Sequence, residues 1–360
     1  MELSTCPDFH KIMKRWEAFW HREILDRPIV NIGVKSSKKL PYPKKTHASL
    51  RERWFDMEYQ LECAEAWIGS MEPAADNVPT WFPNLGPELC ATLFGCELEF
   101  SEFSSWSQPV CTNIRQVTDI KPNFDNPYWS WIRKATEASI QRGAGKWVTG
   151  LPDIHTTGDL LAALRDPQHL CLDMMDDIEG VRLACEYVTT FYPRILDDCY
   201  LQIAKAGNPS TSWTNSFHFG RSIVSQCDFI CMISPEMLEE AILPSIRKEN
   251  EYLERVVYHL DGPGALRHID ALLERGEIDV LQWVYGAGAG PASKWPQVYQ
   301  KAQAKGKGVQ VLCEDMADAR AIMQQIKPQG AWLCVGGQYT HEEIDAFLVD
   351  VTRWGQGKTV

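Results

Sequence analysis

The sequence has few of the features that would place the protein in a membrane or on nucleic acid. No apolar run approaches the roughly 18 residues that a membrane-spanning helix needs. The first residues show neither the apolar core nor the small-residue cleavage site of a signal peptide. Positive charge is scarce, since 36 Lys and Arg stand against 48 Asp and Glu and give a formal net charge of −12. This balance argues against nucleic acid or an anionic membrane as the main partner.

Cysteine is plentiful, but its distribution excludes a disulfide-stapled secreted domain. The 12 cysteines are dispersed over 360 residues, and short disulfide-rich domains concentrate theirs. We therefore expect free, mostly buried thiols and a cytoplasmic protein. A hydrophobic content of 44% and a charged content of 23% are typical of a soluble globular chain.

Short apolar, β-branched runs alternate with helical patterns in the last third of the chain. The runs occupy residues 256–259, 280–284, 309–313 and 331–335, and the helical patterns occupy 265–275, 295–304 and 318–326. Such alternation predicts βα units around a parallel sheet. After the last run, Thr340 and Glu343 form a capping-box pattern at the start of a final helix.

Earlier segments extend the same pattern. Residues 29–34 read as a first strand, and 147–150 read as a strand followed by a helix that Thr157 could cap. No GxGxxG motif follows a strand, so we predict a (β/α)8 TIM barrel, with a doubly wound sheet as the alternative. Helices are expected at 8–22 and 53–67, within an N-terminal helical extension over one face of the barrel.

A linker-like break at 121–129 suggests how the chain is organised. Residues 1–125 would form the N-terminal extension and the first barrel elements. Residues 126–360 would form the remainder of the barrel and carry the metal site, within one structural domain.

Residues able to bind a metal follow the predicted strands, where parallel barrels place their active sites. His259 and Asp261 are two residues apart, so an extended chain points both to one side. Imidazole, carboxylate and thiolate are the usual zinc ligands, and Cys334 ends another strand. Together they could bind a metal with one open position. Alternatively, His259 donates to a backbone carbonyl and Asp261 caps the turn at Gly262.

Further polar residues end other predicted βα strands. Asp153, His155 and Glu314 could act as acid–base or orienting groups. Each has a structural alternative: Asp153 could cap the turn at 156–158, His155 could pack in the core, and Glu314 could be solvated. Cys313, which precedes Glu314, could also enter the metal site.

Several stretches resemble the uroporphyrinogen decarboxylase superfamily, and specifically its zinc-dependent corrinoid methyltransferase branch. They are ILDRPIV (24–30), CDFICMISPEMLEEAILP (227–244), HLDG (259–262) and CVGGQYTHEEIDAF (334–347). HLDG stands where the branch has His-x-Cys-Gly, so Asp261 replaces a cysteine and the ligand set becomes harder. The second stretch resembles a loop containing a functional aspartate, which points to Asp228.

The resemblance implies that His259, Asp261 and Cys334 bind Zn²⁺. It also implies transfer of a methyl group between a small methylated substrate or thiol and a corrinoid protein. The 14 tryptophans would suit a methoxylated aromatic or a methylated amine as the donor. The arginine-rich signature of the decarboxylase itself is absent, which argues against porphyrinogen decarboxylation. A second copy of the chain is a further partner to consider, as a homodimer.

Two other classes of function stay open at this point. The chain could be a metal-free decarboxylase or lyase-type barrel that uses Asp and His as acid and base. It could also be a non-catalytic ligand-binding relative, because a fold does not dictate chemistry.

Overall fold

The computed structural model describes residues 1–358, and a parallel sheet organises them. Six parallel strands pair in the order β1-β10-β9-β8-β7-β6. These strands are β1 (Ile29–Val34), β6 (Ser222–Gln226), β7 (Arg255–Asp261), β8 (Val280–Val284), β9 (Gly308–Cys313) and β10 (Ala331–Tyr339). The first strand thus pairs with the last, and the order lacks the reversal that a doubly wound sheet has.

Two further pairs of strands complete the β-structure. β2 (Thr80–Trp81) pairs in parallel with β5 (Val148–Thr149), and β3 (Leu98–Phe100) pairs antiparallel with β4 (Ser105–Ser107). The Asp76 amide before β2 donates to the Val30 carbonyl of β1, and Leu151 after β5 donates to Thr211 before β6. The first bond connects the β2–β5 pair to β1, and the second connects it to the segment that leads into β6, although strand pairing is not continuous through residues 1–358. The fold is therefore α/β and barrel-like.

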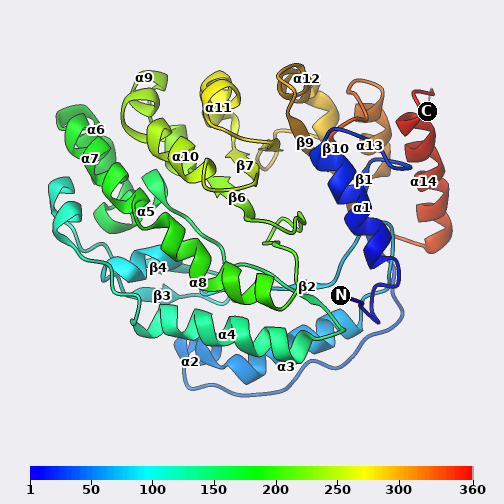
Figure 1. The fold of residues 1–360 in the computed structure, drawn as a ribbon, viewed down its shortest axis with the longest axis horizontal. Coiled ribbons are helices and arrows are strands. Elements are labelled where there is room, and N and C mark those ends of the chain that lie inside the picture. Colours follow the sequence, from blue (N-terminus) through cyan, green and yellow to red (C-terminus); the bar gives the residue numbers. More distant parts are fainter. Residues whose placement is uncertain (359–360) are drawn as a thin grey trace.

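Helices lie around the outside of the strands (Figure 1). In chain order they are α1 (Phe9–Trp20), α2 (Leu50–Phe55), α3 (Met57–Gly69), α4 (Pro127–Gly143), α5 (Thr157–Arg165), α6 (Pro167–Asp176), α7 (Ile178–Thr189), α8 (Tyr192–Lys205), α9 (Pro235–Met237), α10 (Leu243–Asn250), α11 (Ile269–Arg275), α12 (Pro296–Ala304), α13 (Met316–Met323) and α14 (His341–Gly355). No helix within residues 1–358 is both long and apolar enough to cross a membrane. All 12 cysteines are free, as the sequence predicts.

The predicted βα units of the last third are confirmed, with some shifts in their bounds. The strand predicted at 256–259 extends to Asp261, and the strand predicted at 331–335 extends to Tyr339. The capping box of α14 is confirmed, because the Thr340 hydroxyl accepts from the Glu343 amide and the Glu343 carboxylate accepts from the Thr340 amide.

Two local predictions need correction. Thr156, rather than Thr157, is the N-cap residue of α5, and its hydroxyl donates to the buried Glu249 carboxylate at 2.6 Å rather than capping the helix. The single helix predicted at 53–67 is divided into α2 and α3, because Asp56 leaves helical geometry and accepts a hydrogen bond from the Tyr59 amide at the start of α3.

The interior of the strand array is layered. An apolar cluster at one end combines residues of α1 with one residue from each of six strands: Ile29, Val148, Val224, Val257, Val280 and Trp332. Two residues further along, polar side chains share that face because strand side chains alternate. These are Asn31, Gln226, His259, Gln282 and Cys334. α1 therefore covers the N-terminal ends of the strands, and the polar layer lies toward the C-terminal ends.

A buried ion-pair cluster ties α1 to β1. Asp76, with no exposed surface, accepts hydrogen bonds from Arg15 of α1, from Arg27 and from the Val30 amide of β1. Arg15 also pairs with Asp26 at 2.6 Å. A buried charge is tolerated when its partners and hydrogen bonds satisfy it, so these contacts hold each other in place.

We expect Asp76→Asn to lower the free energy of unfolding by about 3–5 kcal/mol, because it leaves buried guanidinium groups without a full partner. Chemical denaturation would measure this loss. Asp26→Asn is the matched control, since Asp26 pairs with the same Arg15 from a partly exposed position and should cost about 1 kcal/mol. Equal losses in the two variants would contradict the central role of Asp76.

Candidate functional site

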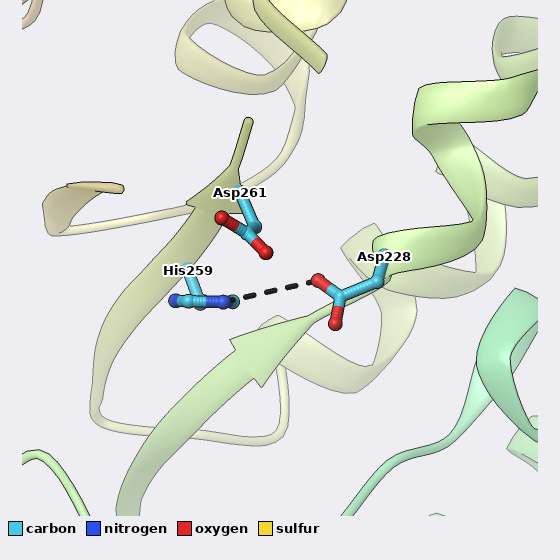
Figure 2. A group of neighbouring side chains, drawn as sticks. All are labelled: Asp228, His259 and Asp261. Atoms are coloured by element: carbon cyan, nitrogen blue, oxygen red, sulfur yellow. Dashed lines mark ion pairs between the residues drawn. The ribbon is translucent and has the colours of Figure 1, made fainter. Parts of the chain in front are cut away.

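Three side chains from two neighbouring strand ends converge. Asp228 begins the 3-10 turn Asp228–Met232, with one residue between it and the end of β6, and His259 and Asp261 lie in the last part of β7. One ligand atom from each of the three lies within 4.8 Å of the others. Figure 2 shows the Asp228 and Asp261 carboxylates beside the His259 ring, whose Nε2 is 3.8 Å from Asp228 Oδ1. The arrangement is a candidate metal centre.

The position of Asp228 is fixed by the loop that carries it. Asp159 of α5 accepts hydrogen bonds from the Asp228 and Phe229 amides, at 3.0 and 2.9 Å. The Asp228 side chain is 50% exposed, whereas the His259 side chain is only 12% exposed. Burial and the negative charge of Asp159 raise the pKa of Asp228.

The second ring nitrogen of His259 begins a chain of hydrogen bonds across the strands. His259 Nδ1 contacts Gln282 Oε1 of β8, Gln282 Nε2 donates to Gln310 Oε1 of β9 at 2.7 Å, and Gln310 Nε2 donates to Cys334 Sγ of β10 at 3.2 Å. The Trp213 ring packs edge-on against His259, with centroids 5.2 Å apart.

The structural alternative for His259 and Asp261 is wrong. His259 contacts a side-chain oxygen rather than a backbone carbonyl, and the Gly262 amide donates to the Val284 carbonyl at 2.9 Å. Within residues 1–358, Asp261 has no side-chain hydrogen bond and caps no turn. Its exposed carboxylate is therefore free to face His259.

Cys334 lies apart from this group. It belongs to β10, three strands along the sheet from β7, and reaches His259 only through the two glutamines. Burial raises the pKa of Cys334 to about 12, and the bond from Gln310 offsets part of that rise. Together with Cys313, whose thiol contacts the Val311 carbonyl, Cys334 lines a cavity of about 500 Å³ that also has residues of β1, of α3 and of the segment at Thr214 in its walls.

His155 lies between two carboxylates and lines the same cavity as Asp228. Its ring nitrogens are 3.2 Å from Asp153 and 3.3 Å from Asp159, and Asp153 also accepts from Gln226 at 2.8 Å. Burial alone would lower the pKa of His155, but the two carboxylates outweigh it and raise the pKa to about 10. Asp153 therefore pairs with His155 and Gln226 instead of capping the turn at 156–158, and His155 is an ion-pair partner.

Glu314 is exposed just beyond β9 and lies outside the three-residue group. Its amide donates to Asp318 at 3.0 Å, while its carboxylate has no hydrogen bond or ion pair within the described chain. Glu314 is therefore solvated, which is the structural alternative that the sequence left open.

A cavity of about 330 Å³ opens beside Asp228. Its charged lining residues are Asp228, His155, Asp159 and Glu88, and Leu160, Ala163 and Phe229 are among its apolar walls. This volume is in the range of small-ligand sites, and it places an apolar body beside the polar group.

Sequence reasoning missed the buried glutamines 226, 282 and 310. Each is less than 7% exposed, and Gln282 and Gln310 are the polar residues of otherwise apolar strands. A buried amide needs partners, so a glutamine as the third residue of two successive apolar strands, β8 and β9, was the available signal.

Comparison with solved structures agrees with the resemblance at the level of the fold. The chain is similar to a methyltransferase from Methanosarcina mazei, with a TM-score of 0.57 and 11% sequence identity, over 94% of this chain and 97% of that chain. No protein-family model and no curated protein matches the sequence. At such low identity the likeness shows a shared α/β fold, while chemistry must be argued from the site.

The His155 ion pairs predict a pH-dependent stability. Because the pKa of His155 is raised in the folded state, its contribution is full below the ordinary value near 6.5 and is lost as pH rises through about 10. We expect His155→Gln to cost a few kcal/mol at pH 6 and much less at pH 10, measured by urea unfolding. A difference that is constant with pH would mean that folding does not favour the protonated ring.

Proposed function

We propose that the protein is a zinc-dependent methyltransferase that moves a methyl group between a small methylated substrate or thiol and a corrinoid protein. The observation that carries the proposal is the convergence of Asp228, His259 and Asp261 at the C-terminal ends of β6 and β7. That edge is where parallel barrels hold their active sites. The shared fold with a methyltransferase supports the reaction class.

The donor set fits a divalent cation. Zinc accepts imidazole nitrogen and carboxylate oxygen at about 2.0–2.2 Å, so two tetrahedral ligands lie roughly 3.4 Å apart. The 3.8 Å between His259 Nε2 and Asp228 Oδ1 is only slightly wider. Two carboxylates and an imidazole form a harder set than one containing thiolates, so manganese, cobalt or iron would compete with zinc.

The ligand set that we favour is Asp228, His259 and Asp261. The sequence resemblance implies Cys334 as the third ligand, but the two glutamines separate it from His259. In this assignment neither Cys334 nor Cys313 is a metal ligand, and both would be free to contact a thiol substrate in the cavity that they line.

The remaining residues would orient the reactants. When bound, zinc would supply a positive charge that lowers the pKa of a thiol or stabilises a departing oxygen. The Asp153–His155–Asp159 group would hold the Asp228 loop, because Asp159 accepts hydrogen bonds from the Asp228 and Phe229 amides. The cavity beside Asp228 would bind the apolar part of a methoxylated aromatic or methylated amine against Leu160 and Phe229. Glu314, at the same edge, is a candidate for contact with the corrinoid protein or substrate.

A metal-free lyase is the second candidate, and His155 is the observation that favours it. With a pKa near 10, the ring would carry a proton at neutral pH and could serve as an acid. It could not serve as a base in that state. Metal content separates this candidate from the methyltransferase.

We expect the purified protein to contain about one zinc per chain, by elemental analysis, and Asp228→Asn and His259→Ala to lose it. Cys334→Ala should retain the metal, whereas loss in that variant would favour the ligand set implied by the resemblance. Glu240→Gln, an exposed carboxylate outside the site, is the control and should retain zinc. A well-folded, metal-free wild type that also fails to bind added zinc would contradict the proposal.

The transfer itself can be followed with free cobalamin in place of the corrinoid protein. We expect methylcobalamin to form from reduced cobalamin and a methoxylated aromatic or a methylated amine, detected by its visible spectrum. His259→Ala should abolish this activity, and Glu240→Gln should not. No methyl transfer from either donor class, with a corrinoid partner supplied, would argue against the reaction.

A further inference from the structure

The hydrogen bonds that lead away from His259 determine which of its nitrogens carries a proton. Gln282 presents its amide oxygen to His259 Nδ1, and an amide oxygen can only accept. Nδ1 therefore carries the hydrogen, and a neutral ring then has a lone pair on Nε2. Nε2 is the atom that faces the carboxylate of Asp228, 3.8 Å away.

The other hydrogen bonds of this series run in the same direction. Gln282 uses its amide nitrogen on Gln310, and Gln310 uses its own on the Cys334 sulfur, which accepts. Strand pairing brings these residues together, since His259 lies opposite Gln282 and Gln282 lies opposite Gln310. Both glutamines are 3% exposed, so water cannot substitute for a lost partner.

The opposite direction would leave the hydrogen-bonding groups of this series less well paired. If Cys334 donated and both amides were reversed, His259 would carry its hydrogen on Nε2. The Asp228 oxygen at 3.8 Å is too distant to accept it as a hydrogen bond. In the observed direction, Nε2 and the carboxylates are electron-pair donors that face one another, an arrangement that a cation between them would satisfy.

We propose that Gln282, supported by Gln310 and Cys334, is a positioning residue that holds His259 in its Nδ1–H form and keeps Nε2 free to bind a metal. This inference rests on the proposed metal site and adds the residues that prepare it. Metal-binding histidines generally donate their second nitrogen to an outer acceptor, and losing that acceptor typically weakens metal affinity 10–100-fold. The edge-on Trp213 ring helps to fix the plane of the imidazole.

The tautomer can be measured without any metal. Protein labelled with ¹⁵N-histidine is studied by two-bond ¹H–¹⁵N NMR at pH 8, where an ordinary imidazole is neutral. His259→Gln identifies the resonances of His259. We expect the Nδ1–H form in the wild type, and its loss or mixture with the Nε2–H form in Gln282→Leu. Gln282→Glu keeps an acceptor for Nδ1 and should retain the Nδ1–H form.

Gln226→Leu is the matched control. Gln226 is also buried and lies opposite His259 on the other side of β7, but it donates to Asp153. It should leave the tautomer unchanged. Zinc dissociation constants, from chelator competition, should rise 10–100-fold in Gln282→Leu and change little in the exposed control Glu240→Gln.

The outcomes separate this inference from the proposed function. An Nε2–H form in the wild type overturns the inference even if the protein binds zinc and transfers methyl groups. If the wild type has the Nδ1–H form and Gln282→Leu loses it, the result supports the positioning role of Gln282 even if methyl transfer is never found. Unchanged zinc affinity in Gln282→Leu would show that this positioning does not serve metal binding.

Discussion

The alternation of side chains along parallel strands is the constraint on which the site depends. Val257 and Val280 point into the apolar end of the strand array, and His259 and Gln282 follow two residues later on the same face. The apolar layer, which α1 covers, separates the polar layer from solvent at the N-terminal ends of the strands. Because a buried amide or imidazole must be hydrogen-bonded, the polar residues of neighbouring strands bond to each other and acquire fixed orientations.

Negative charge dominates the outer part of the site. Asp228 and Asp261 face His259, while Asp153 and Asp159 flank His155. The second group is neutralised in part by the His155 imidazolium, whereas the first has no lysine or arginine among its members. Carboxylates that are held together without a permanent cation raise each other's pKa or attract a metal ion. This imbalance is the reason that we propose a metal ion there rather than an acid–base pair.

Much of the architecture could be predicted from local patterns. The strands at 280–284 and 309–313, the αβ alternation and the Thr340 capping box depend on neighbours in sequence, and the structure confirms them. Local sequence patterns predict the start of a helix less well where two neighbouring residues could each be the N-cap. At the start of α5, Thr156 precedes the helix but bonds to Glu249, a residue more than ninety positions away, which no local pattern reveals.

The sequence by itself determined that His259 and Asp261 share one side of a strand, because two-residue spacing on an extended chain has only that outcome. It also determined that these residues follow an apolar strand and precede a turn. Only the tertiary structure decided that Asp228 joins them, that Cys334 stands apart, and that Gln282 and Gln310 fill the space between. Contacts across strands depend on strand order and register, and these are set by the packing of the whole interior.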